Sequence, residues 1–134
     1  MFHEPMDEAK IRAMSSLALA HIGDGVYELM VRTMLCRRGE LRQDTMHRET
    51  VRYVSALAQS KAAARLLPLL TDAERAVYTR ARNAKCHASP SGCTVAQYHA
   101  ATALEALFGS LWLAGETARL QELFQICMEE INAS

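Results

Sequence analysis

Apolar side chains recur every three or four residues through most of this 134-residue chain, and no segment alternates between apolar and polar residues. The longer spacing buries one face of a helix, whereas a half-buried strand needs strict alternation. Ala and Leu, which favour helices, dominate the hydrophobic half of the composition. The pattern predicts an all-α fold, and a chain of this length suits a single domain over residues 1–134.

Helix breakers and capping motifs divide the chain into five or six expected helices. Capping boxes are expected to begin two of them, "TDAE" at 71–74 and "TVAQ" at 94–97. Gly39 and Gly115 are expected to end two others. The expected helices cover about 7–21, 24–38, 44–66 with a break near Arg52, 71–85, 95–114 and 116–131.

The bulk properties favour a cytoplasmic protein without a membrane segment. No run of about 18 uncharged apolar residues is present, and "MFHEPMDEAK" lacks a signal-peptide pattern. The four scattered cysteines are expected to be reduced. The net charge is zero, yet residues 32–85 hold 12 Lys and Arg against 5 Asp and Glu, which gives +7. This basic middle is either a contact for a polyanion or a solvated helical surface.

The apolar segment "LALAHIGDGVYELMV" at 17–31 contains Gly23, Asp24 and Gly25. Each glycine costs about 1 kcal/mol relative to alanine inside a helix, so a reason for the pair is needed. Asp24 is either the N-cap of a helix that starts near Gly25 or a carboxylate that binds a cation. In a helix, Glu28 would share its face, and the small glycines would admit a backbone or a ligand.

Glu105 is a second isolated carboxylate, in "ATALEALFGSLWLAG" at 101–115, with Gly109 four residues later. A buried carboxylate needs a partner, which is either a basic side chain from the 75–85 helix or a metal ion. Two such carboxylates, each next to a glycine, favour a hard cation such as Mg²⁺.

The segment "RARNAK" at 80–85 could hold phosphate oxygens through Arg82, Asn83 and Lys85. Taken alone, these residues are better explained as the basic C-terminus of an ordinary helix. A polar loop follows, and its side chains could touch a ligand. A zinc site is the alternative for the four ligand-type residues of this region, although their spacing fits no standard pattern. These residues are Cys86, His87, Cys93 and His99.

Three segments occur in the order and spacing of one known family: "LALAHIGDGVYELMVR", "RARNAK" and "TVAQYHAATALEALFGSLWL". The chain resembles the Mini-ribonuclease III family over about residues 15–130. The resemblance implies a homodimeric, helical ribonuclease III-type endonuclease domain without a separate double-stranded-RNA-binding domain. It implies cleavage of double-stranded RNA with Mg²⁺, which Mn²⁺ can replace. It also implies maturation of the large-subunit ribosomal RNA precursor, with a large-subunit ribosomal protein as a helper.

The resemblance assigns the two lone carboxylates, Asp24 and Glu105, as catalytic metal ligands. Ala20 and Thr102 stand where the larger ribonuclease III enzymes have acidic residues. Glu28 and Thr102 are expected around the ligands. The alternative is an inactive RNA-binding or ribosome-associated protein of the same fold, which we would expect to lack one of the two carboxylates. The residues expected to contact RNA are Arg82, Asn83, Lys85 and His87.

Overall fold

The structure is a computed structural model, and it describes residues 3–40, 42–84 and 92–134. All regular secondary structure in these ranges is helical, which confirms the expected all-α class. None of the helices described is long and apolar enough to cross a membrane. The elements are α1 (Glu8–Ala13), α2 (Ser16–Arg37), α3 (Gln43–Val54), α4 (Ala56–Leu66), the short 3₁₀ helix η1 (Leu67–Leu69), α5 (Asp72–Arg82), α6 (Val95–Leu113) and α7 (Thr117–Ala133).

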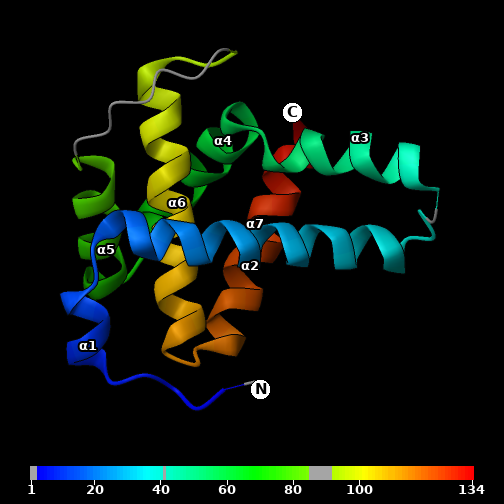
Figure 1. Ribbon diagram of the computed structural model, residues 1–134. Helices are drawn as coiled ribbons and strands as arrows, with labels where there is room; N and C mark the ends of the chain where they lie inside the picture. Colours follow the sequence, from blue (N-terminus) through cyan, green and yellow to red (C-terminus); the bar gives the residue numbers. More distant parts are fainter. Residues whose placement is uncertain (1–2, 41, 85–91) are drawn as a thin grey trace.

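Helix α6 lies at the centre of the bundle (Figure 1). It packs against α2, α4, α5 and α7, and α2 crosses it in front in this view. A helix surrounded in this way must be apolar on nearly every side, which explains the sequence from Ala101 to Leu111. The rings of Tyr27, Phe108 and Phe124 meet beside it, edge to face, with centroids 5.3 and 5.8 Å apart. Glu105 is therefore the one charged side chain of the central helix.

Helix α2 differs from the expectation of separate helices over 7–21 and 24–38. The break lies earlier, at Met14 and Ser15, and α2 then runs unbroken to Arg37. Ser15 begins it, because its hydroxyl oxygen accepts a hydrogen bond of 3.1 Å from the Ala18 amide. The expected boundary beside Gly23 was wrong. Asp24 lies inside the helix and is not its N-cap, which leaves the second of the two interpretations.

The remaining boundaries lie close to those expected. The helix expected over 44–66 is broken at Ser55 rather than near Arg52, and Ser55 accepts a hydrogen bond from the Ala58 amide. Both capping boxes are formed. Gly39 and Gly115 follow α2 and α6 with φ angles of 95° and 74°, the left-handed conformation that glycine adopts without strain.

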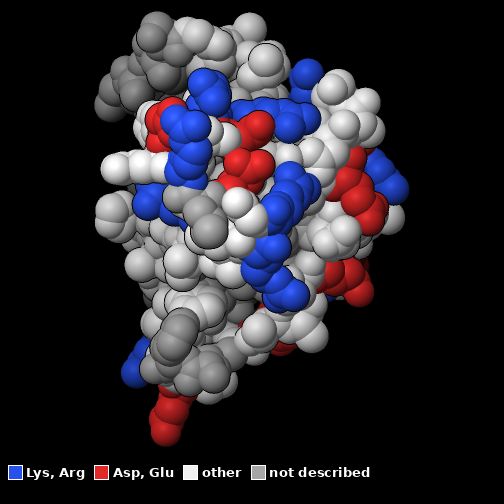
Figure 2. Space-filling view, turned by 90° about the vertical axis from the view of Figure 1, so that its right-hand side faces the viewer, with Lys and Arg blue, Asp and Glu red and all other residues white. Residues whose placement is uncertain are grey.

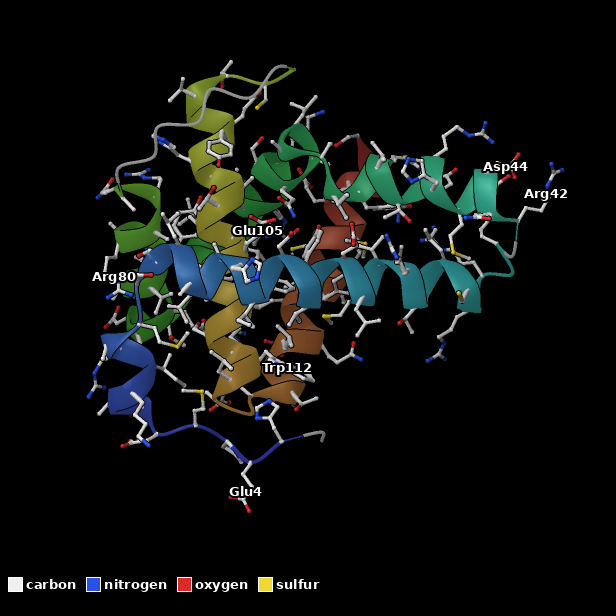
Figure 3. The ribbon with its side chains drawn as sticks, viewed as in Figure 1. Glu4, Arg42, Asp44, Arg80, Glu105 and Trp112 are labelled. Atoms are coloured by element: carbon white, nitrogen blue, oxygen red, sulfur yellow. The ribbon has the colours of Figure 1, made fainter. Side chains whose placement is uncertain are left out.

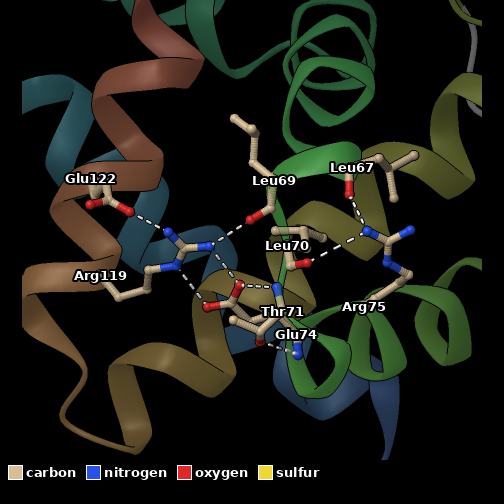
Figure 4. Close-up of polar contacts among 8 residues, drawn as sticks. All are labelled: Leu67, Leu69, Leu70, Thr71, Glu74, Arg75, Arg119 and Glu122. Carbon is tan, nitrogen blue, oxygen red and sulfur yellow. Dashed lines mark hydrogen bonds and ion pairs between the residues drawn. The ribbon is translucent and has the colours of Figure 1, made fainter.

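A polar cluster fastens α5 to α7 (Figure 4). The Arg119 guanidinium makes an ion pair of 2.8 Å with the buried Glu74 carboxylate and donates to the Leu69 carbonyl. It also pairs with Glu122. The hydrogen bond from Arg119 lowers the pKa of Glu74, which keeps this buried carboxylate charged. The cluster is structural, because its charged groups pair with one another and with backbone carbonyls.

Candidate active site

Two glycines bring the backbones of α2 and α6 into direct contact. A Cβ atom added to Gly23 would lie 1.6 Å from the carbonyl oxygen of Glu105, and one added to Gly109 would lie 2.1 Å from that of Leu19. Any side chain at either position would force the helices apart. The glycines therefore fix the crossing point of α2 and α6, and they place Asp24, the neighbour of Gly23, beside Glu105.

The carboxyl groups of Asp24 and Glu105 meet at this crossing and interact with each other. In Figure 3, Glu105 lies on α6 where this helix passes behind α2. Burial, which has the largest effect, and the neighbouring Asp24 carboxylate together raise the pKa of Glu105 to about 8. Asp24 is exposed and Glu105 is only half-buried, so the pair opens to solvent.

The sequence reasoning missed Gln59 of α4. Its side chain is 2% exposed and faces the Glu105 carboxyl, and this contact lowers the pKa of Glu105 against the larger effects of burial and Asp24. The contact is not a well-formed hydrogen bond, because Nε2 of Gln59 has no partner among the described residues. A glutamine among alanines in "ALAQSKAAA" was the available signal.

Tyr27 closes the inner side of the site. Its ring is completely buried, its hydroxyl donates a hydrogen bond of 3.4 Å to the Tyr53 carbonyl, and burial raises its pKa. The Glu105 charge contributes to the same rise, which places this ring close to the carboxyl pair. The inner wall of the site is thus buried and uncharged at Tyr27 and Gln59, so a charge on Glu105 has to be balanced from the open side.

The structure does not bring the other predicted acidic and hydroxyl residues into bonding contact with the pair. Glu28 makes an ion pair of 3.3 Å with Arg32, one turn along α2. The Thr102 hydroxyl donates a hydrogen bond of 3.0 Å to the Tyr98 carbonyl within α6. Their expected roles around a metal ion stay predictions.

The predicted RNA contacts lie at the end of α5. Arg82 and Asn83 are exposed there, while Lys85 and His87 lie outside the described residues, as does Cys86 of the zinc alternative. The C-terminal end of α5 and the N-terminal half of α6 point toward the same end of the bundle (Figure 1). Neither Arg82 nor Asn83 pairs with Glu105, so the basic partner considered for this carboxylate is absent from the described part of α5.

The donor set suits a small divalent cation. Two neighbouring carboxyl groups offer hard oxygen ligands at one point, and a cation bound between them would relieve the repulsion between the two charges. No cluster of three or more Asp, Glu, His or Cys residues is found in the parts of the chain that are described. A site of two carboxylates suits Mg²⁺, which usually keeps several water ligands and binds phosphate oxygens as well.

Comparison with known proteins agrees with this geometry. Residues 17–116 match the ribonuclease III domain family. The chain belongs to this family. It is 44% identical to "Mini-ribonuclease 3" of Symbiobacterium thermophilum, over 87% of this chain and 89% of that protein. It is 38% identical to "Mini-ribonuclease 3" of a Thermoanaerobacter species, over 96% and 91% of the two chains.

A solved structure shares the fold as well. The crystal structure of a Fusobacterium nucleatum protein covers 90% of this chain and is itself covered over 96% of its length, with a TM-score of 0.81 and 30% identity. These matches confirm the resemblance to the Mini-ribonuclease III family. As a member of the ribonuclease III domain family, the chain is an endoribonuclease of that class. The crossing of α2 and α6, with Asp24 and Glu105, is its candidate active site.

Proposed function

We propose that this protein cleaves double-stranded RNA with a Mg²⁺ ion held between Asp24 and Glu105, and that its substrate is the structured precursor of large-subunit ribosomal RNA. The carboxylate pair carries the proposal, because helices distant in sequence bring the two groups to one solvent-facing point. Mn²⁺ is expected to replace Mg²⁺, since both prefer oxygen ligands. The named relatives support the class of substrate.

Each carboxylate has its own task in this mechanism. Glu105, which is half-buried, would hold the ion from the side of the core, and the exposed Asp24 would hold it from the side of the solvent. When bound, Mg²⁺ supplies positive charge that activates a water molecule and neutralises the scissile phosphate. Because the raised pKa favours a protonated Glu105 below about pH 8, a bound cation would have to displace that proton, and binding should strengthen as the pH rises toward 8.

Basic side chains at two places are expected to hold the RNA backbone. The first group comprises Arg82 and Asn83 at the end of α5, and Lys85 and His87, which lie outside the described residues, are expected to join it. Figure 2 shows the face formed by the far ends of α2 and α3, where Lys and Arg side chains gather with acidic ones between them. Contacts of this kind position a duplex without reading its sequence and make binding depend on salt.

A homodimer is expected to place two such sites on one duplex, with a two-fold axis that matches the two strands. An apolar groove on the outer side of α2 supports this, and its lining includes Ile22, Leu29, Met30 and Trp112. Leu29 lines this groove and is 59% exposed, so a partner subunit could cover it. In sedimentation, Leu29→Glu should be monomeric. Leu57→Glu, which alters a comparably exposed leucine on α4, should sediment like wild type.

The reaction is expected to take place in the cytoplasm. Cys36, Cys93 and Cys127 are free thiols, as expected in a reducing compartment. A large-subunit ribosomal protein is expected to assist by presenting the RNA, so the naked precursor should be cut more slowly than the precursor bound to ribosomal proteins.

Cleavage of a structured ribosomal RNA precursor in the presence of Mg²⁺ tests the proposal. Asp24→Asn and Glu105→Gln should each reduce the rate by about 100-fold or more, because several kcal/mol of charge stabilisation is lost. Glu8→Gln is the matched control. This exposed carboxylate of α1 pairs with Arg12 at 2.8 Å and should be dispensable. Normal cleavage by Asp24→Asn would contradict the mechanism.

A further inference from the structure

Gln59 stands out on a helix face that is otherwise apolar. The buried residues of α4 are Ala58, Gln59, Ala62, Ala63 and Leu66, and only Gln59 among them is polar. These positions lie three and four residues apart and face α6 and α7. A buried amide without a hydrogen bond costs about 1–3 kcal/mol, so a glutamine here needs a reason.

The direction of the side chain supplies that reason. The Gln59 amide faces the Glu105 carboxyl, yet Nε2 has no hydrogen-bond partner within the described residues. The carboxyl group of Glu105 is at the same time engaged with Asp24. An amide nitrogen is a hydrogen-bond donor, and a carboxylate oxygen is a strong acceptor for it.

We propose that Gln59 is a positioning residue for the active site: its buried amide donates to Glu105 once this carboxylate holds a divalent cation, and so directs one carboxylate oxygen toward the ion. Gln59 touches neither the RNA nor the ion and acts only through Glu105. The proposal rests on the proposed function, because it assumes that Asp24 and Glu105 hold the cation.

This arrangement explains the unpaired amide. A donor that finds a hydrogen-bond acceptor only when the cation is bound destabilises the metal-free site and stabilises the metal-bound site. The difference favours cation binding. Hydrogen-bonding partners of metal ligands commonly change metal affinity by about 10–100-fold. Gln59 would thus lower the stability of the metal-free protein and raise its affinity for the ion.

The test measures Mn²⁺ binding by calorimetry at pH 8, without RNA, together with urea unfolding in the absence of metal. Gln59→Met keeps the length and the helix propensity of the side chain and removes the donor. We expect its affinity for Mn²⁺ to fall about tenfold. Its stability without metal should equal or exceed that of wild type, because the unpaired amide is gone. Excess Mg²⁺ should restore RNA cleavage by Gln59→Met but not by Asp24→Asn.

Two further variants keep every outcome decisive. Ser60→Ala alters the neighbouring residue, whose hydroxyl bonds only to the Leu57 carbonyl of α4, and should bind Mn²⁺ like wild type. Gln59→Asn keeps the amide but is one methylene shorter, and should also lose affinity. Unchanged Mn²⁺ affinity in Gln59→Met would overturn the positioning role. Unfolding of both Gln59 variants, with Ser60→Ala folded, would overturn it as well and assign Gln59 to packing. Failure of the wild type to bind Mn²⁺ would instead refute the proposed function.

Discussion

Gly23 and Gly25 lie two residues apart in α2, and we expect opposite responses when each is replaced by alanine. In a helix interior this substitution normally stabilises a protein by about 0.5–1 kcal/mol, because glycine loses more backbone freedom on folding. At Gly25 no atom lies within 4 Å of the added Cβ, so only this gain should remain. At Gly23 the added Cβ meets the backbone of α6.

The size of the effect at Gly23 follows from the contact distances. The added Cβ would lie 1.6 Å from the Glu105 carbonyl oxygen, whereas ordinary contacts begin at 3.4 Å, so α2 and α6 would have to move apart by about 1.8 Å. Overpacking against movable side chains costs about 1–3 kcal/mol. Here both partners are helix backbones, so we expect a net loss of about 3 kcal/mol. This is a large part of the 5–15 kcal/mol that typically stabilises a domain.

Urea unfolding of Gly23→Ala, Gly25→Ala and wild type measures both effects. Gly23→Ala should also lose RNA cleavage, because separation of the helices moves Glu105 away from Asp24. Gly25→Ala should match or exceed the stability of wild type. The reasoning would be refuted if Gly23→Ala were as stable as wild type, or if the two variants lost stability equally.

Other predictions concern charge and capping. Because burial and Asp24 raise the pKa of Glu105 from its ordinary 4.5 to about 8, native protein without metal binds more protons than unfolded protein between these values. Its stability should therefore fall with pH across this window, by at most about 1.4 kcal/mol per unit, and Glu105→Gln should flatten the slope in urea unfolding at pH 5, 7 and 9. Ser55→Ala removes the cap of α4 and should cost about 1 kcal/mol in the same assay at pH 7; no loss would show that the cap is dispensable. Arg119→Met leaves the Glu74 carboxylate buried without its cation and should cost about 2 kcal/mol or more; recovery in a double variant with Glu74→Gln separates lost pairing from lost packing.

Local signals allowed most of the helices to be predicted from the sequence. The periodicity of apolar residues predicts the helical class, and the capping boxes at Thr71 and Thr94 involve only a few neighbouring residues. Both signals can therefore be recognised without knowledge of the tertiary structure. The boundary at Gly23 could not be predicted in this way. A glycine normally weakens a helix, and here the contact with α6, more than 80 residues later, compensates for that weakness.

The difference between local and long-range signals also explains which residues of the candidate site could be identified from the sequence. Asp24 and Glu105 were predictable because each is a lone carboxylate in an apolar helix, which is a local anomaly. Gln59 was missed because a single amide is unremarkable until its burial and its position beside Glu105 are known. The hydrophobic pattern of α4 shows that its face is buried, but not which side chain lies opposite.

The central claim is that Asp24 and Glu105 hold one cation together, and a double-mutant cycle tests it most directly. Cleavage of a duplex RNA at saturating substrate is measured over a range of Mg²⁺ concentrations for wild type, Asp24→Asn, Glu105→Gln and the double variant. If the two carboxylates act as one unit, the double variant loses no more activity than the worse single variant. Losses that multiply, with the Mg²⁺ dependence of wild type unchanged in either single variant, would contradict a shared site.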